Sequence, residues 1–344
     1  LRPYEVKIGS GILDSFGAEL KGVHKPCRVA LVTDSNVEPL YAERAENSLK
    51  AAGFDPLTIV FPAGEQHKKL SVMADILEKM AEGGLTRSDM AVALGGGVTG
   101  DMAGFAASVY QRGIPFAQIP TTLLAAVDSS VGGKTAVDLP EGKNQAGCFY
   151  QPSLVLCDTD ALATLPEDEY RNGCAEVIKY GMIGDRDFFN SLLAKPVREH
   201  FEEVITRCVE MKRDVVEKDE FDTGLRMLLN FGHTFGHSVE ACSGYAIPHG
   251  QAVAIGMASI TQAACSFGHC GADVPQALLQ ILSLYGLPTQ IPYPAQDLAN
   301  AALSDKKAQG GSIRLVVPEE IGKCTIQKVS REELTAWLRA GGAK

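Results

Sequence analysis

The hydrophobic positions in the first half of the chain form short β-branched runs that alternate with longer amphipathic segments. Short apolar runs are typical of buried strands, and a 3.6-residue period of apolar positions is typical of helices. We therefore expect strands over residues 28–33, 57–61, 90–94, 114–119, 135–137 and 154–157. We expect helices over residues 37–52, 70–82 and 98–110. This alternation predicts a mostly parallel sheet with helices on both faces, as in Rossmann-like α/β domains.

The pattern changes after Leu165 and Pro166, where long helical periods replace the alternation. We expect helices over residues 167–183, 201–218, 225–242 and 251–267, with one late strand over residues 313–317. The sequence thus predicts an α/β domain over residues 1–165 and a mainly α-helical domain over residues 166–344. With 344 residues, 45% of them hydrophobic, the chain has enough apolar mass for two cores.

The charge balance narrows the class of partner. Lys and Arg number 32 against 42 Asp and Glu, which gives a net charge of -10. Such a surface repels nucleic acid and anionic membrane, so we expect neither as a partner. An anionic small molecule would need a local group of basic side chains, and this makes Lys and Arg within glycine-rich or apolar segments informative.

The cysteines indicate a reducing compartment. There are nine, scattered along the chain and never in a Cys-x-x-Cys pair. No basic-then-apolar leader precedes Leu1, and each long apolar stretch is interrupted well short of a membrane span. We therefore expect a cytoplasmic protein. The missing initiator Met leaves room for a trimmed targeting extension.

A glycine-rich turn suggests a nucleotide site. The segment LGGGVTGD, residues 94–101, fits G-x-G-x-x-G between a strand and a helix, where close backbone approach and free N–H groups suit a pyrophosphate. Its place after two α/β units departs from the usual fingerprint on the first turn, so a tight turn needing glycine for a positive φ stays open as an alternative. Polar residues also end two other predicted strands, at residues 33–36 and 64–68, and a nucleotide lies at such carboxyl ends.

Basic residues cluster in three further segments. Lys134, Lys143 and Asn144 lie in segments flanked by glycine, which we expect to be loops, and Arg112 closes a predicted helix just before a strand. The segment DSSVGGKT resembles a phosphate loop but lacks the Walker spacing. Together these groups predict a basic pocket at one sheet edge, although each could singly be a surface charge.

The second half carries a candidate metal site. Glu176 and Lys179 lie one helical turn apart, which is typical of an exposed ion pair. Because their neighbours in the sequence are apolar, the two charges could instead face a polar group in the interior. In the expected helix over residues 225–242, His233 and His237 would project from one side together with Arg226 and Asn230. With His249 downstream and Glu176 upstream, there are enough nitrogen and oxygen ligands for a divalent cation. Spacing alone favours both His233 and His237 as ligands.

Eight strings in this order resemble the 3-dehydroquinate synthases of the sugar-phosphate cyclase superfamily: LGGGVTGDMAGFAASVYQRG, IPTTLLAAVDSSVGGKTAVD, GKNQAG, FYQP, AEVIKYG, LRMLLNFGHTFGH, PHG and SDKK. The resemblance covers nearly the whole chain. It implies an NAD-binding Rossmann-like domain, a helical domain, an active site in the cleft between them, and a homodimer.

The resemblance also assigns residues. It implies metal ligands Glu176, His233 and His249, with zinc as the usual ion and cobalt possible. It implies nucleotide contacts by Asp34, Asn36, Glu65, Lys68, Gly96, Gly97, Asp101, Thr121, Thr122, Asp128, Lys134, Lys143 and Thr164. It implies substrate and catalytic groups Arg112, Lys134, Lys143, Asn144, Lys179, Lys212, Arg226, Asn230, His237 and Lys306, the last chosen over Lys307.

The implied reaction converts 3-deoxy-D-arabino-heptulosonate 7-phosphate into 3-dehydroquinate and phosphate, in the shikimate route to aromatic amino acids. Its steps are transient oxidation by NAD, phosphate elimination, reduction and intramolecular aldol closure. Three alternatives stay open: a cyclase of the same fold that acts on a neutral heptulose phosphate, a metal-dependent alcohol dehydrogenase, and a non-catalytic module. Activity on a substrate that lacks the carboxylate would indicate the neutral-sugar cyclase, and net accumulation of NADH would indicate the dehydrogenase. The non-catalytic module would bind no metal and release no phosphate.

Overall fold

Six short, largely apolar segments pair into one sheet in the N-terminal part of the computed structural model, which describes residues 3–305 and 312–344. The strands are β1 (Glu5–Gly9), β2 (Arg28–Asp34), β3 (Asp55–Phe61), β4 (Met90–Gly95), β5 (Phe116–Pro120) and β8 (Leu154–Asp158). Their order is β1-β8-β5-β4-β2-β3, and every pairing is parallel. The predicted mostly parallel sheet is confirmed.

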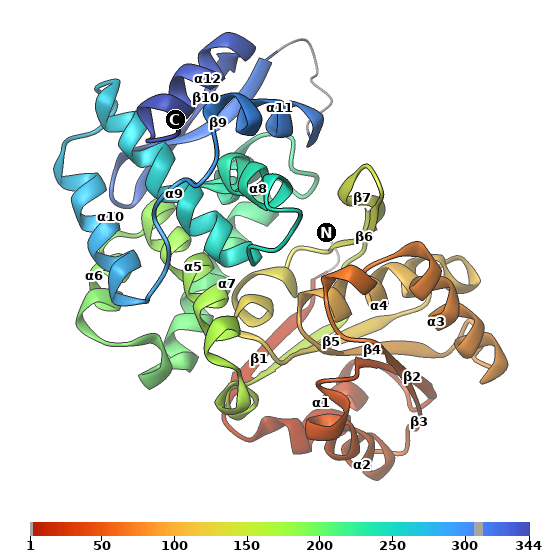
Figure 1. The fold of residues 1–344 in the computed structure, drawn as a ribbon. Helices are drawn as coiled ribbons and strands as arrows, with labels where there is room; N and C mark the ends of the chain where they lie inside the picture. The colour runs from red at the N-terminus through yellow and green to blue at the C-terminus, as the bar shows by residue number, and fades with distance from the viewer. Residues whose placement is uncertain (1–2, 306–311) are drawn as a thin grey trace. The chain divides into compact units, whose positions relative to one another are not determined.

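Helices cover both faces of this sheet because its strands are apolar on both sides. The helices are α1 (Phe16–Val23), α2 (Glu43–Ala51), α3 (Leu70–Glu82) and α4 (Gly97–Val109). Successive side chains of a strand point to opposite faces, so Val29 and Leu31 of β2 join a core with α1 and α2. Ala30 and Val32 join a second core with α3 and α4. Figure 1 shows the two helix pairs on opposite sides of the strands.

The strand order reverses at β2. The chain passes from β2 outward to β3 on one side, then returns to β4 and β5 on the other side of β2. Ligands of open α/β sheets bind in the crevice at such a switch point, outside the carboxyl ends of the strands. The glycine-rich turn follows β4, so it lies at the switch point even though it is not on the first strand–helix turn.

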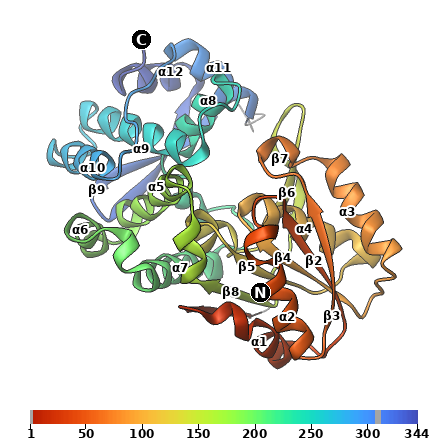
Figure 2. The ribbon, with the colours of Figure 1, turned by 60° about the horizontal axis from the view of Figure 1, so that its bottom comes forward.

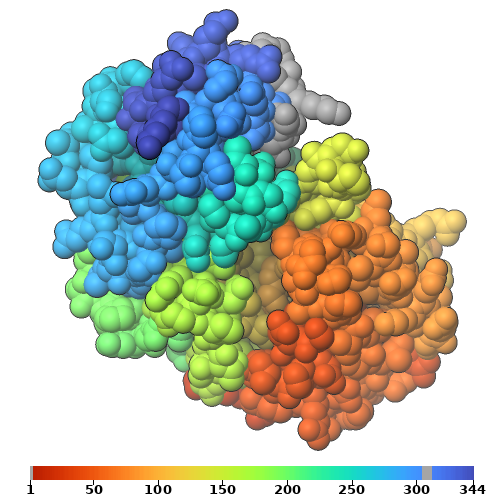
Figure 3. Space-filling view, in the orientation of Figure 1, coloured from red at the N-terminus to blue at the C-terminus, as the bar shows by residue number. Residues whose placement is uncertain are grey.

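Two further strands form a hairpin apart from the main sheet. β6 (Lys134–Leu139) and β7 (Gly142–Phe149) are antiparallel partners. The hairpin projects from the N-terminal unit in Figures 1 and 2, and in Figure 3 it rises as a yellow knob above the orange surface of that unit. The expectation that Lys134, Lys143 and Asn144 lie in loops is therefore wrong. Glycines favour turns, but here backbone pairing with β6 holds the polar β7 segment extended.

The second unit is mainly helical, and this part of the predicted fold class is confirmed. Its helices are α5 (Glu167–Gly184), α6 (Arg186–Ala194), α7 (Phe201–Lys218), α8 (His233–Cys242), α9 (His249–Ser266), α10 (Asp273–Leu284), α11 (Ala295–Asp305) and α12 (Arg331–Ala340). A hairpin of β9 (Ser312–Glu320) and β10 (Lys323–Ser330) completes it. Helix α9 is almost entirely buried and packs against α5, α8, α10 and α12 (Figure 2).

The chain divides into the units Leu1–Pro166 and Glu167–Lys344. The predicted domain boundary lies one residue earlier, between residues 165 and 166. Within residues 3–305 and 312–344, none of the helices combines the length and the apolar character needed to cross a membrane.

The helix expected over residues 225–242 is interrupted, and this part of the prediction is wrong. A 3-10 helix, η8 (Leu225–Asn230), ends before Gly232, and α8 begins at His233. Gly232 has a φ of 78°, in the left-handed region that breaks a helix. A Cβ at Gly232 would lie 2.5 Å from the Cγ of Met257 on α9, so the close packing of α9 also requires glycine there. Arg226 and Asn230 therefore do not share a helix with His233 and His237.

Candidate functional site

The residues expected to hold a nucleotide lie at the carboxyl ends of four adjacent strands. Asp34 ends β2, and Gly96 and Gly97 follow β4. Glu65 lies in η3 (Glu65–His67), which follows β3, and Thr121 follows β5 directly. Because β5, β4, β2 and β3 are neighbours in the sheet, these polar groups line one edge around the switch point.

The glycine-rich turn is built for close packing. Gly95, Gly96 and Gly97 are absent from the residues with positive φ, so the alternative reading of a left-handed tight turn is wrong. A Cβ at Gly95 would lie 2.5 Å from the Thr99 hydroxyl, and one at Gly100 would lie 2.5 Å from the Gln118 side-chain oxygen. The N-cap of α4 is Gly96, which has no side chain to cap the helix, so the first N–H groups of α4 suit an anion.

Asp34 is held against this turn. Its Oδ1 accepts hydrogen bonds from the backbone N–H groups of Asn36, at 2.9 Å, and Val37, at 3.2 Å. Its Oδ2 accepts from the Thr99 hydroxyl of α4 at 3.1 Å. The carboxylate at the end of β2 is thus fixed next to the first turn of α4, where an acid can bind ribose hydroxyls.

Lys68 contacts two other predicted residues, Asp101 and Asn144. Its Nζ lies 2.5 Å from the Asp101 Oδ2 and 2.5 Å from the Asn144 Oδ1, and its residue is only 4% exposed. Burial alone would lower the pKa of Lys68, but the nearby carboxylates of Asp101 and Glu65 outweigh it and raise that pKa. Lys143 Nζ in turn lies 3.2 Å from Glu65 Oε1. Lys143 of the hairpin, Lys68 and the predicted nucleotide acids Glu65 and Asp101 therefore form one charged network.

Sequence reasoning missed Asp138 of β6. Its Oδ1 accepts a hydrogen bond of 2.8 Å from the backbone N–H of Asn144, which has a φ of 55°. Its own backbone N–H donates to the Lys68 carbonyl at 2.8 Å. Burial raises the pKa of Asp138 above its ordinary value, despite the opposing hydrogen bond from Asn144 and the charge of Lys68. No spacing signal marks this residue, because its partners meet it only when the hairpin forms.

The remaining predicted residues of this unit are dispersed over several elements. Arg112 ends η4 (Tyr110–Arg112) with a φ of 65°, and Asp128 lies in η5 (Ala125–Ser129). The Thr122 Oγ1 accepts from the Ala125 N–H at 3.1 Å, and the Thr164 Oγ1 lies 2.6 Å from the Tyr41 hydroxyl. The buried Thr121 hydroxyl has no hydrogen-bond partner among the residues that the structure describes.

The C-terminal unit brings three potential metal ligands together from three helices. Glu176 comes from α5, His233 is the first residue of α8, and His249 is the first residue of α9. One ligand atom from each lies within 4.8 Å of the others. The Nε2 atoms of His233 and His249 are each 3.4 Å from the Glu176 Oε1. His237, which spacing alone had favoured as a ligand, is not part of this group.

The electrostatics of this group are those of a buried carboxylate among nitrogen groups. Burial would raise the pKa of Glu176, but Lys179, whose Nζ lies 2.6 Å from Oε2, and the two histidines hold that pKa well below its usual value. Burial lowers the pKa of His233. For His249, burial is outweighed by the nearby carboxylates of Glu176 and Glu240, which raise its pKa to about 10. Glu176 and Lys179 are each 1% exposed, so the exposed-pair reading is wrong.

The donor set fits a divalent cation. Apart from its ion pairs, neither oxygen of Glu176 accepts a hydrogen bond within the described residues, although the side chain is buried. Buried polar atoms normally have such partners, so this carboxylate is suited to a cation ligand. Two imidazoles and one carboxylate are the protein ligands of many catalytic zinc sites, which keep a position open for water or substrate. A zinc-type ion is therefore compatible with the residues present.

Buried cations accompany this group within the same unit. Lys212 of α7 is 5% exposed and Arg226 of η8 is 1% exposed, and both elements pack against α5, which carries Lys179. Fully buried Lys and Arg are rare without a partner. Arg226 is tied down through its backbone N–H, which donates to Asp219 Oδ2 at 3.0 Å, and its side chain donates to the Glu220 carbonyl at 2.5 Å. Asn230 ends η8, and Lys306 lies outside the described residues.

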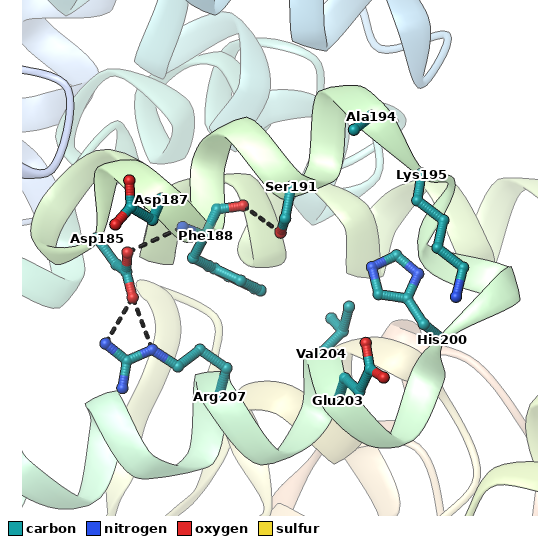
Figure 4. A pocket seen from close by; sticks show the side chains of 10 residues that line it. All are labelled: Asp185, Asp187, Phe188, Ser191, Ala194, Lys195, His200, Glu203, Val204 and Arg207. Carbon is teal, nitrogen blue, oxygen red and sulfur yellow. Dashed lines mark hydrogen bonds and ion pairs between the residues drawn. The ribbon is translucent and has the colours of Figure 1, made fainter.

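A separate pocket of about 440 Å³ lies between α6 and α7. Figure 4 shows its lining, in which the Asp185 carboxylate accepts from the Phe188 N–H and pairs with Arg207. Its lining also includes Lys195, His200 and Glu203. None of the predicted site residues is among its lining residues, so we place the candidate site at the Glu176 group and not here.

Comparisons with known proteins agree with this chemistry. The chain matches the family model "3-dehydroquinate synthase N-terminal" over residues 58–172 and the model "3-dehydroquinate synthase C-terminal" over residues 173–308. A 3-dehydroquinate synthase of Enterococcus faecalis is 45% identical over 98% of this chain and 97% of its own length.

Solved structures extend the comparison. A 2-epi-5-epi-valiolone synthase of Streptomyces hygroscopicus, solved with NAD+ and Zn2+, has a TM-score of 0.90 at 28% identity and covers 99% of this chain and 97% of its own. An NADH-dependent butanol dehydrogenase of Thermotoga maritima has a TM-score of 0.70 at 15% identity, covering 99% and 97%, and shares the fold alone. On the family models and the sequence identity, the chain belongs to the 3-dehydroquinate synthase family.

Proposed function

We propose that this chain converts 3-deoxy-D-arabino-heptulosonate 7-phosphate into 3-dehydroquinate and phosphate. The observation that carries the proposal is the group of buried Glu176 with the partly exposed His233 and His249, beside buried Lys and Arg side chains. A metal-ligand set next to cations suits a substrate with an oxygen to polarise and anionic groups to neutralise. The 45% identity to a 3-dehydroquinate synthase supports the same substrate.

Two cofactors complete the proposal. NAD would lie along the carboxyl ends of β5, β4, β2 and β3, with its pyrophosphate at the N-terminus of α4. Zn2+, or Co2+ in its place, would be held by Glu176, His233 and His249 and would polarise a substrate oxygen as a Lewis acid. The valiolone synthase of similar fold was solved with NAD+ and Zn2+, which supports this pair.

The side chains of this chain bind and orient the substrate. Lys179, Lys212 and Arg226 would neutralise its carboxylate and phosphate through charge-assisted hydrogen bonds. Arg112, Lys134, Lys143, Asn144 and Lys306 would add contacts from other segments, and Asn230 would bind a hydroxyl. His237, whose side chain is 36% exposed, would donate a hydrogen bond or transfer a proton at the substrate. A histidine is suited to that role near neutral pH.

We further propose that the protein is a cytoplasmic homodimer. The homodimer rests on the family resemblance alone. All nine cysteines are free thiols, which supports a reducing compartment. The proposed small-molecule partner is a phosphorylated keto-acid.

One assay separates this function from its rivals. Phosphate release is followed with NAD present at far less than one equivalent of substrate, while absorbance reports NADH. Phosphate should appear over many turnovers without lasting NADH, because the hydride returns to the substrate. Stoichiometric NADH would instead establish an alcohol dehydrogenase, and equal activity on a heptulose phosphate without a carboxylate would establish a cyclase for neutral sugars.

A further inference from the structure

Glu240 is a buried acid that the proposed chemistry does not use. It lies on α8, three residues after His237 and seven after His233, which places it on the same face of the helix. The residue is 1% exposed. A carboxylate is almost never buried to this extent unless charged or hydrogen-bonding groups face it. The groups that face Glu240 therefore indicate its role.

Both ring nitrogens of His249 face buried carboxylates. Its Nδ1 lies 3.4 Å from Glu240 Oε2, and its Nε2 lies 3.4 Å from Glu176 Oε1. A neutral imidazole donates through one nitrogen and offers a lone pair on the other. If Nδ1–H donates to Glu240, the lone pair of Nε2 is directed to the side where Glu176 and His233 converge, as a metal ligand requires.

His233 is oriented in the same way by a different acceptor. Its Nδ1 lies 3.0 Å from the Phe231 carbonyl oxygen, and its Nε2 lies 3.4 Å from Glu176 Oε1. Each proposed ligand histidine thus has an acceptor behind its Nδ1 and the shared carboxylate in front of its Nε2. For His233 the acceptor is backbone and cannot be changed by mutation, whereas for His249 it is a side chain.

Glu240 also belongs to a second group of potential ligands, with His237 and His249. Its Oε2 lies 4.0 Å from His237 Nε2. A cation bound in this second group would need the lone pair of His249 Nδ1. In the tautomer described above, Nδ1 carries the proton and has no lone pair to offer. Donation from Nδ1–H to Glu240 would therefore favour the group of Glu176, His233 and His249 over this alternative.

We propose that Glu240 is a positioning residue that fixes the tautomer and ring orientation of His249 for cation binding. The inference rests on the proposed metal site. Replacing an acceptor behind a ligand histidine typically weakens metal binding about 10- to 100-fold. We therefore expect Glu240→Gln, which keeps the side-chain volume but loses the charge, to weaken Zn2+ binding by about tenfold or more.

The experiment titrates Zn2+ into metal-free parent protein and Glu240→Gln in competition with a chelator, and records the visible absorption of the Co2+ forms. The matched control is Ser238→Ala on the same helix, which removes a buried hydroxyl that donates to the Thr234 carbonyl at 3.0 Å but faces no proposed ligand. Glu240→Asp is titrated as well, in case the amide variant does not fold. Thermal unfolding of the metal-free proteins reports any loss of fold.

The expected result is weaker Zn2+ binding and an altered Co2+ spectrum in the Glu240 variants, with parent affinity in Ser238→Ala and phosphate release restored by excess metal. Unchanged Zn2+ affinity and an unchanged Co2+ spectrum in a folded Glu240 variant would overturn the inference. So would a parent protein that binds no metal. If the parent binds metal but releases no phosphate, the proposed function fails while the titration still decides the role of Glu240.

Discussion

Three histidines of the C-terminal unit, His233, His237 and His249, lie close together, but their ring nitrogens face different groups. All three ring centroids lie within 5.9 Å of one another, so proximity alone does not identify the ligands. The Nε2 atoms of His233 and His249 face Glu176, whereas the Nε2 of His237 lies 4.0 Å from Glu240. This difference in direction leads to a test of the ligand set.

We predict that His233→Ala and His249→Ala lose most of their bound metal, because each removes one of three protein ligands. His237→Ala should keep its metal and lose turnover, because it removes the proposed proton-transfer group. Elemental analysis of the purified variants and phosphate-release rates measure the two effects. Depletion in His237→Ala together with retention in His249→Ala would refute the assignment and favour the helical spacing of His233 and His237.

Asp219 organises the loop that leads to Arg226. Its carboxylate accepts from the backbone N–H groups of Thr223, at 3.0 Å, Gly224, at 2.7 Å, and Arg226, at 3.0 Å. These hydrogen bonds, chiefly that from Thr223, lower the pKa of Asp219 from 3.8 to about 2. A carboxyl group whose pKa is lower in the folded than in the unfolded state stabilises the fold at pH values above its unfolded-state pKa. This stabilisation is lost as the pH falls through the folded-state pKa.

We therefore predict that Asp219→Asn lowers the melting temperature near neutral pH, and that this difference from the parent narrows as the pH falls from about 4 toward 2. Melting curves at stepped pH values measure it. Asp214→Asn on α7 is the control, since its carboxylate pairs with exposed Arg213 and such surface pairs contribute little. A difference between Asp219→Asn and parent that stays constant over this range would contradict the account.

At the scale of elements, hydrogen bonds of Asp138, Asn144 and Lys68 tie the β6–β7 hairpin to the segment before α3. Asp138 accepts from the Asn144 N–H, Asn144 Oδ1 accepts from Lys68 Nζ, and the Asp138 N–H donates to the Lys68 carbonyl. These bonds join both strands to the segment before α3. They would hold Lys143 and Asn144, the proposed substrate contacts of β7, in one arrangement.

We predict that Asp138→Ala raises the KM for the heptulosonate phosphate about fivefold, with the fold retained. The reason is the loss of one hydrogen bond, worth about 1 kcal/mol, that fixes Asn144. Steady-state phosphate release and thermal unfolding are the measurements. Glu141→Ala, an exposed acid at the tip of the same hairpin, should leave KM unchanged. An equal rise in both variants would mean that hairpin charge, rather than the Asp138 contact, is responsible.

The elements that sequence predicted well are those with a strong period. The apolar runs of β2 and β4 and the amphipathic helices α3 and α7 are recovered because their own side chains decide their structure. The β7 segment, GKNQAGCF, has no such run, and only its pairing with β6 makes it a strand. The break at Gly232 is likewise imposed by α9, which packs against it. The conformation of these two segments depends on tertiary contacts, which the spacing of apolar residues along the chain does not reveal.

The same division applies to the site. The sequence shows which residues could be metal ligands, and it shows that Glu176 and Lys179 lie one helical turn apart. In the structure these two side chains form an ion pair with a distance of 2.6 Å between Lys179 Nζ and Glu176 Oε2. It does not show which group each ring nitrogen faces. Spacing alone therefore could not decide which of His233, His237 and His249 are metal ligands. Asp138 and Glu240 were missed for the same reason, since their partners lie on other segments of the folded chain.

At the scale of the whole molecule, the two proposed cofactors draw on different units. The predicted nucleotide contacts run from Asp34 to Thr164, within Leu1–Pro166. The proposed metal ligands come from α5, α8 and α9, within Glu167–Lys344. Each cofactor alone should therefore stabilise the elements that carry its own ligands.

We predict that Zn2+ alone slows amide hydrogen exchange in α5, α8 and α9, and that NAD alone slows it around β2, β4 and the N-terminus of α4. A ligand at 100 times its Kd stabilises the bound state by about 2.7 kcal/mol. Amides that exchange only through local unfolding that also disrupts the binding site should then exchange about a hundredfold more slowly. Exchange followed by mass spectrometry on peptides locates the effect. The His249→Ala variant should lose the Zn2+ effect and keep the NAD effect. Zn2+ protection confined to residues 1–166 would show that the metal binds elsewhere than at Glu176, His233 and His249.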